Sequence, residues 1–143
     1  MPISELTWDE IRQLVYERAN GCCEYCQTCE VNSGQTMQID HIIPHGGDNP
    51  DNLCLSCWNC NNAKRAALNA IDPRTNQNVP LYNPRSQIWQ DHFRWIDGGT
   101  LIEGITPEGR ATIIRLKMNR PAIVIARHRW VQGGYHPPAN RSE

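Results

Sequence analysis

Two Cys-x-x-Cys pairs, Cys23 with Cys26 and Cys57 with Cys60, constrain this chain more than any other feature of its sequence. Four thiolates are a tetrahedral ligand set for one zinc ion, and two such pairs complete a closed structural site. That site would draw both pairs, and the chain between them, into one small unit. The cysteine spacing therefore specifies part of the fold as well as a metal centre.

Three further cysteines are present: Cys22, Cys29 and Cys54. They leave the choice of ligands open, because Cys26 with Cys29, or Cys54 with Cys57, would also form a Cys-x-x-Cys pair. We prefer the first choice, since it places Asn61 directly after the last ligand, at the start of a helix. An odd number of cysteines cannot be fully paired, and in a reducing compartment seven of them favour metal binding over a disulfide scaffold.

The length of 143 residues predicts one domain, or a small metal-stabilised module with an extension. The longest wholly apolar run, Ala122 to Ala126, is far too short to cross a bilayer. No segment resembles a signal peptide. We therefore expect a cytoplasmic protein with no membrane partner.

The formal net charge of −1 conceals an asymmetry between the two ends of the chain. Residues 1–40 carry two basic and seven acidic side chains, whereas residues 107–143 carry seven basic and two acidic ones. A basic C-terminal face could approach a polyanion, although arginines on helices also serve only to solvate a surface. Charge alone does not separate these two interpretations.

Local patterns in the first half of the chain predict a strand, a loop, a second strand and a helix. A capping box formed by Thr7 and Glu10 begins an earlier helix, which Asn20-Gly21 ends. The predicted elements are a helix over 8–19, strands over 35–43 and 53–55, and a helix over 59–70. Together they predict an α+β fold with a small ββα unit clipped by a four-cysteine zinc site.

The second half predicts a hairpin followed by two helices. The hairpin strands, 93–96 and 101–105, flank an Asp-Gly-Gly-Thr turn, and the helices begin at Pro107 and Pro121. Several prolines and asparagines between the two halves indicate an irregular connector. We therefore divide the chain into a module with an N-terminal helix over 1–70, a connector over 71–87, and an accessory region packed against the module over 88–143.

Several short motifs follow one another in a specific order along residues 18–65. They are Cys23-Glu24-Tyr25-Cys26, Ile39-Asp40-His41-Ile42-Ile43-Pro44, Gly46-Gly47, Asn52-Leu53, and Cys57-Trp58-Asn59-Cys60-Asn61 with Lys64. This order closely resembles the zinc-containing HNH endonucleases. Residues 81–138 are similar, less specifically, to the C-terminal region of some bacterial HNH proteins.

The resemblance implies a ββα-metal nuclease that hydrolyses DNA phosphodiester bonds with a divalent cation. It assigns His41 as the general base and Asn52 as the brace of the catalytic loop, while Asp40 and Asn61 hold the cation. Many relatives have histidine where this chain has Asn61, so the chain is an H-N-N variant. An amide oxygen suits a hard cation, so we expect Mg²⁺ or Mn²⁺ at the catalytic site and Zn²⁺ at the structural one.

The residues support these roles independently of the resemblance. Phosphodiester hydrolysis requires a group that takes a proton from water and a cation that stabilises the charge on the phosphate oxygens. An imidazole can take the proton, and a carboxylate can hold the cation. Asp40 and His41 are neighbours, however, and neighbours on a regular strand face opposite sides. If both serve one site, we expect the backbone to depart from ideal extension there.

Three residues are candidates for contact with nucleic acid: Lys64, Arg65 and His45. Asn61, Lys64 and Arg65 are spaced to share one helix face near its N-terminus, where free amides favour phosphate. The alternative for the two cations is a solvated helix surface. Trp89, Phe93 and other aromatic residues nearby could stack on bases, but such spacing is more typical of a core.

Two other classes of function compete with a DNA endonuclease. The first is a noncatalytic zinc module that binds nucleic acid or a protein, which would have no need of Asp40, His41, Asn52 and Asn61 together. The second is a redox protein that uses Cys22, Cys29 and Cys54. RNA is not excluded as the substrate, and the sequence predicts no oligomeric state.

Overall fold

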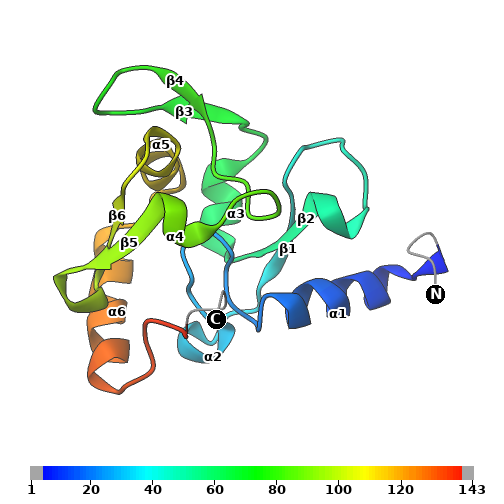
Figure 1. The fold of residues 1–143 in the computed structure, drawn as a ribbon. Helices are drawn as coiled ribbons and strands as arrows, with labels where there is room; N and C mark the ends of the chain where they lie inside the picture. The colour runs from blue at the N-terminus through cyan, green and yellow to red at the C-terminus, as the bar shows by residue number, and fades with distance from the viewer. Residues whose placement is uncertain (1–4, 140–143) are drawn as a thin grey trace.

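The computed structural model describes residues 5–139. The elements in chain order are α1 (Trp8–Arg18), α2 (Glu30–Ser33), β1 (Gln38–His41), η2 (Pro50–Asn52), β2 (Leu53–Ser56), α3 (Trp58–Lys64), β3 (Asn69–Ile71), β4 (Asn78–Pro80), α4 (Trp89–His92), β5 (Phe93–Ile96), η3 (Asp97–Gly99), β6 (Leu101–Gly104), α5 (Pro107–Leu116) and α6 (Pro121–Gln132). Short helices and two-stranded sheets are mixed along the chain (Figure 1). The predicted α+β fold class is confirmed.

Helix α1 begins where the capping box predicts. Thr7 Oγ1 accepts the amide of Glu10 at 3.2 Å, and Glu10 Oε1 accepts the amide of Thr7 at 3.1 Å. The helix buries Ile11 and Val15 and extends to one side of the molecule (Figure 1). In its last turn, Arg18 donates to the carbonyl of Leu53 at 2.7 Å, which ties the helix to the start of β2.

The predicted ββα unit is present, with β1 antiparallel to β2 and α3 directly after β2. Every residue of β2 is buried. The two strands form a two-stranded sheet, so each pairs along one edge only. The helix is shorter than the predicted 59–70, because Arg65 adopts a left-handed φ of 52° and ends α3 at Lys64. The chain then turns into β3, so this part of the sequence prediction is wrong.

A hairpin formed by β3 and β4 begins in the segment predicted as helix and continues into the expected irregular connector. Its turn is anchored by the buried carboxylate of Asp72, which accepts from Arg110 Nε and Nη2, each at 2.9 Å. The Arg110 guanidinium holds the pKa of Asp72 well below its usual range. An ion pair between distant segments therefore orders a stretch that has little local structural signal.

The C-terminal half follows its prediction closely. Strands β5 and β6 pair antiparallel, Thr106 caps α5, and α5 and α6 lie on the opposite side of the ββα unit from α1 (Figure 1). One cluster of buried apolar side chains spans both halves of the chain. Trp89 and Phe93 belong to this cluster, which favours their interpretation as core residues. The division into a module, connector and accessory region stays a prediction.

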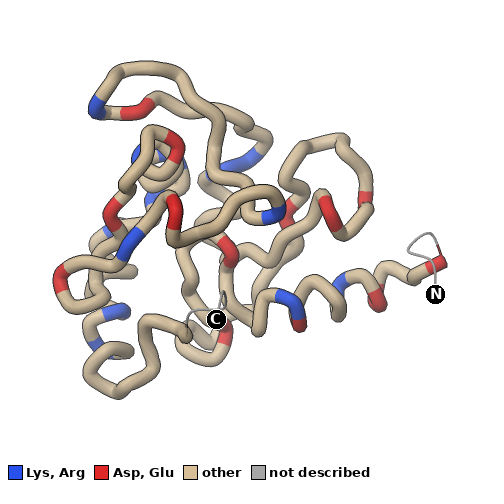
Figure 2. The backbone as a smooth tube through the Cα atoms, in the orientation of Figure 1, with Lys and Arg blue, Asp and Glu red and all other residues tan. Residues whose placement is uncertain are grey.

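Cationic side chains are frequent along α5 and α6 (Figure 2). Two of them do not contribute to an open basic surface: Arg110 pairs with Asp72, and Arg127 is fully buried. Arg115, Lys117 and Arg129 are exposed. Within residues 5–139, no helix combines the length and the apolar character needed to span a bilayer.

Candidate active site

The four predicted zinc ligands converge at the centre of the fold. The Sγ atoms of Cys23, Cys26, Cys57 and Cys60 all lie within 4.8 Å of one another, and all four residues are buried. Cys57 is the N-cap of α3, and its sulfur accepts the amide of Cys60 at 3.3 Å. The alternative pairs Cys26/Cys29 and Cys54/Cys57 are not brought together in this cluster.

The chemistry of the cluster suits a divalent metal ion. Neighbouring thiols hydrogen-bond to Cys26 and lower its pKa, while burial raises the pKa of Cys23. A bound cation would offset the cost of ionising thiols that are removed from water. A closed, all-cysteine, buried set is that of a structural site, and it suggests zinc.

The remaining cysteines are placed outside the cluster. Cys22 and Cys29 are joined in a disulfide, although the sequence argument expected reduced thiols. They lie on either side of the Cys23–Cys26 turn and face each other through an isolated β-bridge. Cys54 is a buried thiol on β2, opposite Asp40 in the register.

Asp40 and His41 border one hollow although β1 remains regular as far as His41. The departure from extension that we expect if both residues serve one site is not seen at Asp40 or His41, since both belong to β1. The hollow is lined by residues of β1, of the loop that follows it and of the segment 61–65. The polar residues that line this hollow are Asp40, His41, His45, Asp48, Asn61 and Arg65.

The His41 imidazole lies at the end of β1 and is partly open to solvent. Its Nε2 atom lies 2.7 Å from Oδ1 of Asp48, and its side chain is 39% exposed. A carboxylate at this distance holds the ring in one orientation through Nε2. Sequence reasoning missed Asp48, whose only signal was its position after Gly46-Gly47 in the loop between the strands.

Asp40 is a buried residue of β1, and its carboxylate contacts three polar side chains. Its Oδ2 atom accepts from the Tyr25 hydroxyl at 2.7 Å and lies 3.1 Å from Lys64 Nζ. The Cys54 thiol lies 3.7 Å from the same oxygen. Burial raises the pKa of both Tyr25 and Cys54, so both remain protonated donors to the carboxylate.

Lys64 does not present its charge to a nucleic acid, so this sequence prediction is wrong. Its side chain is 2% exposed, and Nζ contacts the Asp40 carboxylate together with the carbonyls of His41 and Ile42, each at 3.3 Å. Lys64 is the last residue of α3, and its side chain lies between this helix and the end of β1. Arg65, by contrast, is exposed at the rim of the hollow, as is His45.

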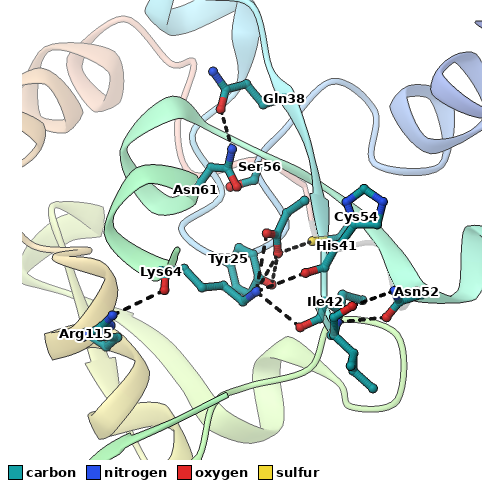
Figure 3. Close-up of polar contacts among 12 residues, drawn as sticks. Tyr25, Gln38, His41, Ile42, Asn52, Cys54, Ser56, Asn61, Lys64 and Arg115 are labelled. Carbon is teal, nitrogen blue, oxygen red and sulfur yellow. Dashed lines mark hydrogen bonds and ion pairs between the residues drawn. The ribbon is translucent and has the colours of Figure 1, made fainter. Parts of the chain in front are cut away.

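Asn61 lies one helical turn before Lys64 and also lines the hollow. Its Nδ2 donates to Gln38 Oε1 at 2.6 Å, which orients the amide (Figure 3). Within residues 5–139, no donor contacts the amide oxygen of Asn61. An oriented amide oxygen and a carboxylate on the same hollow are hard donors and fit a cation such as Mg²⁺.

The Asn52 side chain makes three hydrogen bonds to the 43–47 loop, which borders the hollow. Its Oδ1 accepts from the Ile43 amide at 2.9 Å, and Nδ2 donates to the carbonyls of Ile43 at 3.0 Å and Gly47 at 3.1 Å. Gly46 permits this contact, because a Cβ at that position would lie 2.7 Å from Asn52 Nδ2. The geometry is that of a brace between the loop and the start of β2.

Substituting Asn52→Ala should impair cleavage far more than folding. Losing the three bonds should lower the free energy of unfolding by about 1–3 kcal/mol. Displacing the loop by about 1 Å should lower the cleavage rate by about 100-fold. The measurements are thermal unfolding and single-turnover cleavage of plasmid DNA.

The matched control is Asn49→Ala. Asn49 Oδ1 accepts the Asp51 amide at 2.9 Å, a hydrogen bond at the start of η2 rather than to the 43–47 loop. This variant should lose similar stability and retain most of its cleavage rate. Equal losses of rate in the two variants would contradict a bracing role for Asn52.

The antiparallel strand pair, the following helix and the buried four-cysteine cluster define a small ββα-metal unit. Residues 23–67 match the family model described as HNH endonuclease, so this part of the chain is an HNH domain, a domain of nuclease type. The match covers the cluster, β1, β2 and α3 and ends before β3. Comparisons with curated proteins and with solved structures returned no match.

Proposed function

We propose that this protein is an endonuclease that hydrolyses DNA phosphodiester bonds with a divalent cation, and that zinc at the four cysteines is structural. One observation carries the proposal. The His41 imidazole is open to solvent and oriented by Asp48, at the edge of a hollow that Asp40 and Asn61 also line. The match of residues 23–67 to the HNH model supports the same reaction class.

In this proposal His41 is the general base. Its ring is held by Asp48 at 2.7 Å, and the side chain is exposed enough for water to reach it. Removing a proton from the attacking water creates an imidazolium, which the Asp48 carboxylate stabilises. Asp48 thus acts as a positioning residue for His41.

Asp40 and Asn61 would hold the catalytic cation. When bound, Mg²⁺ or Mn²⁺ supplies positive charge for the phosphate oxygens and the departing oxygen. Two protein oxygens leave most of an octahedral shell for water and substrate, as is usual for Mg²⁺ sites. The buried cluster of cysteines has the opposite character, since all four ligand positions are filled by the protein.

The surface around the hollow suits a polyanion. Arg65 and His45 are exposed at its rim, and Arg115 lies beside the end of α3, where its Nη2 is 3.5 Å from the Lys64 carbonyl. Within the described part of the chain, no acidic side chain forms an ion pair with Arg65 or Arg115. These cations would contact phosphates on either side of the cleaved bond, without reading the base sequence.

A nicking assay tests the proposal on the full chain loaded with zinc. Supercoiled plasmid should be nicked when Mg²⁺ or Mn²⁺ is added and should remain intact without an added cation. Excess EDTA should stop the reaction, and excess Mg²⁺ should restore it as long as zinc analysis shows that the cluster is still occupied.

Parallel reactions with single-stranded DNA and with RNA define the substrate class. Cleavage of RNA alone would correct the substrate, and would leave the reaction type in place. Binding of plasmid without any cleavage, under every cation, would favour the noncatalytic zinc module and contradict the endonuclease.

A further inference from the structure

The Lys64 ammonium is a fixed internal cation in the proposed nuclease centre. It is 2% exposed and contacts oxygens of three consecutive residues at the end of β1: the Asp40 carboxylate and the carbonyls of His41 and Ile42. An ammonium has three donors and no acceptor, so this set of oxygens satisfies it. The contacts hold the carboxylate of Asp40, the proposed cation ligand, and the backbone at and just after His41, the proposed base.

These contacts join the C-terminal end of α3 to the C-terminal end of β1. The strand ends at His41, where the backbone enters the loop braced by Asn52. Because Lys64 holds the carbonyl of His41 and that of the next residue, it fixes the backbone from which the imidazole projects (Figure 3). Lys64 therefore helps to fix the positions of both His41, the proposed general base, and Asp40, the proposed metal ligand.

The same ammonium occupies a position next to the proposed cation ligand. Lys64 Nζ lies 3.1 Å from Asp40 Oδ2 and 3.4 Å from Oδ1. Two positive charges that share one carboxylate repel each other, and the repulsion is weakly screened where water is excluded. A divalent cation that approaches Asp40 therefore meets a charge that is already in place.

We propose that Lys64 is a positioning residue that acts as a built-in counter-cation for Asp40. It keeps the carboxylate and the two carbonyls in place before the metal arrives, and it lowers the affinity of the free protein for divalent cations. Negative charge from the substrate phosphate then offsets the repulsion, so metal and substrate bind together. This inference rests on the proposed function, in which Asp40 is the cation ligand.

A Mn²⁺ titration of the zinc-loaded full chain without nucleic acid tests this inference. Bound Mn²⁺ is measured by electron paramagnetic resonance and by calorimetry. Lys64→Met, which removes the charge and keeps much of the volume, should bind Mn²⁺ about tenfold more tightly than the natural protein, or tighter still. Asp40→Asn should lose the site, which shows that the titration reports on Asp40.

Arg65→Met is the matched control, because it removes the next positive charge along the chain. Arg65 is exposed, so water and salt screen it, and its loss should change the Mn²⁺ affinity by less than about twofold. No gain in affinity for Lys64→Met, or an equal gain for Arg65→Met, would overturn the role of Lys64.

Loss of the buried charge also leaves Asp40 unpaired, so the variants are first checked for zinc content and circular dichroism. If Lys64→Met loses its zinc, the same titration is carried out on Lys64→Gln, which retains hydrogen-bond donors. If neither variant keeps zinc, Lys64 is required only for folding and the inference is wrong.

The titration also separates this inference from the nuclease proposal. Intact plasmid together with the expected gain in Mn²⁺ affinity would contradict the endonuclease and retain the counter-cation. Normal cleavage by the natural protein without the gain would contradict only the counter-cation.

Discussion

Loss of the metal ion from the four-cysteine cluster should unfold the protein. Cys60→Ala removes one of four buried ligands that hold together the Cys23–Cys26 turn and the start of α3. Structural zinc contributes on the order of 10 kcal/mol in small domains, which is comparable with the whole stability of a domain. Zinc analysis, far-ultraviolet circular dichroism and thermal unfolding, with and without a strong chelator, measure the effect.

Cys54→Ala is the matched control for this prediction. Cys54 is also a buried thiol in the same core, but it is not a member of the cluster. It should keep one zinc per chain and lose only the stability expected for a small buried side chain, about 1–2 kcal/mol. A Cys60→Ala protein that stays folded in chelator would show that the apolar core suffices without the metal.

Replacing His41 by alanine should abolish cleavage while the fold and the zinc remain. The residue lies at the end of an edge strand and its side chain is partly exposed, so little packing is lost. A general base contributes about 100-fold to 10,000-fold to the rate. Single-turnover cleavage of plasmid DNA with Mg²⁺, alongside zinc analysis and thermal unfolding, measures the effect.

The dependence of the rate on pH tests the chemical role of His41 more directly. Cleavage by the natural protein should fall as the medium becomes acidic, because a protonated imidazole cannot accept a proton. Any residual cleavage by His41→Ala should not show the fall in rate that protonation of the imidazole causes. Normal turnover in this variant would remove His41 from the mechanism.

His45→Ala is the matched control for the His41 variant. His45 is an exposed histidine of the loop that follows β1, at the rim of the hollow. Its loss should weaken binding of DNA and raise KM, with a much smaller effect on kcat than the loss of His41. Similar losses of kcat in both variants would indicate that loop conformation, rather than the base, limits the reaction.

Much of the fold could be predicted from short-range sequence signals. The Thr7 and Glu10 capping box, the paired strands around the Asp-Gly-Gly-Thr turn and the proline at the start of α5 all specify geometry within a few residues. The zinc ligand set was also predictable, because a Cys-x-x-Cys turn presents two sulfurs from one short segment. The structure confirms these elements and brings the four cysteines into one cluster, which suggests zinc.

The end of α3 and the hairpin that follows it could not be predicted in this way. Residues after Lys64 contain alanines and a leucine that favour helix, yet the chain turns at Arg65 and forms β3. The hairpin that follows is held by Asp72 and Arg110, which are far apart in sequence. Helix propensity is a weak preference, and a local pattern does not reveal such contacts between distant segments.

The sequence by itself determined which residue types are available for the proposed chemistry and the order in which they occur. Only the tertiary structure decided their surroundings: Asp48 beside His41, Tyr25 and Lys64 on Asp40, and Lys64 inside the protein rather than on its surface. The reason is physical. Whether a side chain is buried, and which charge it meets, depends on segments that pack against it from elsewhere in the chain.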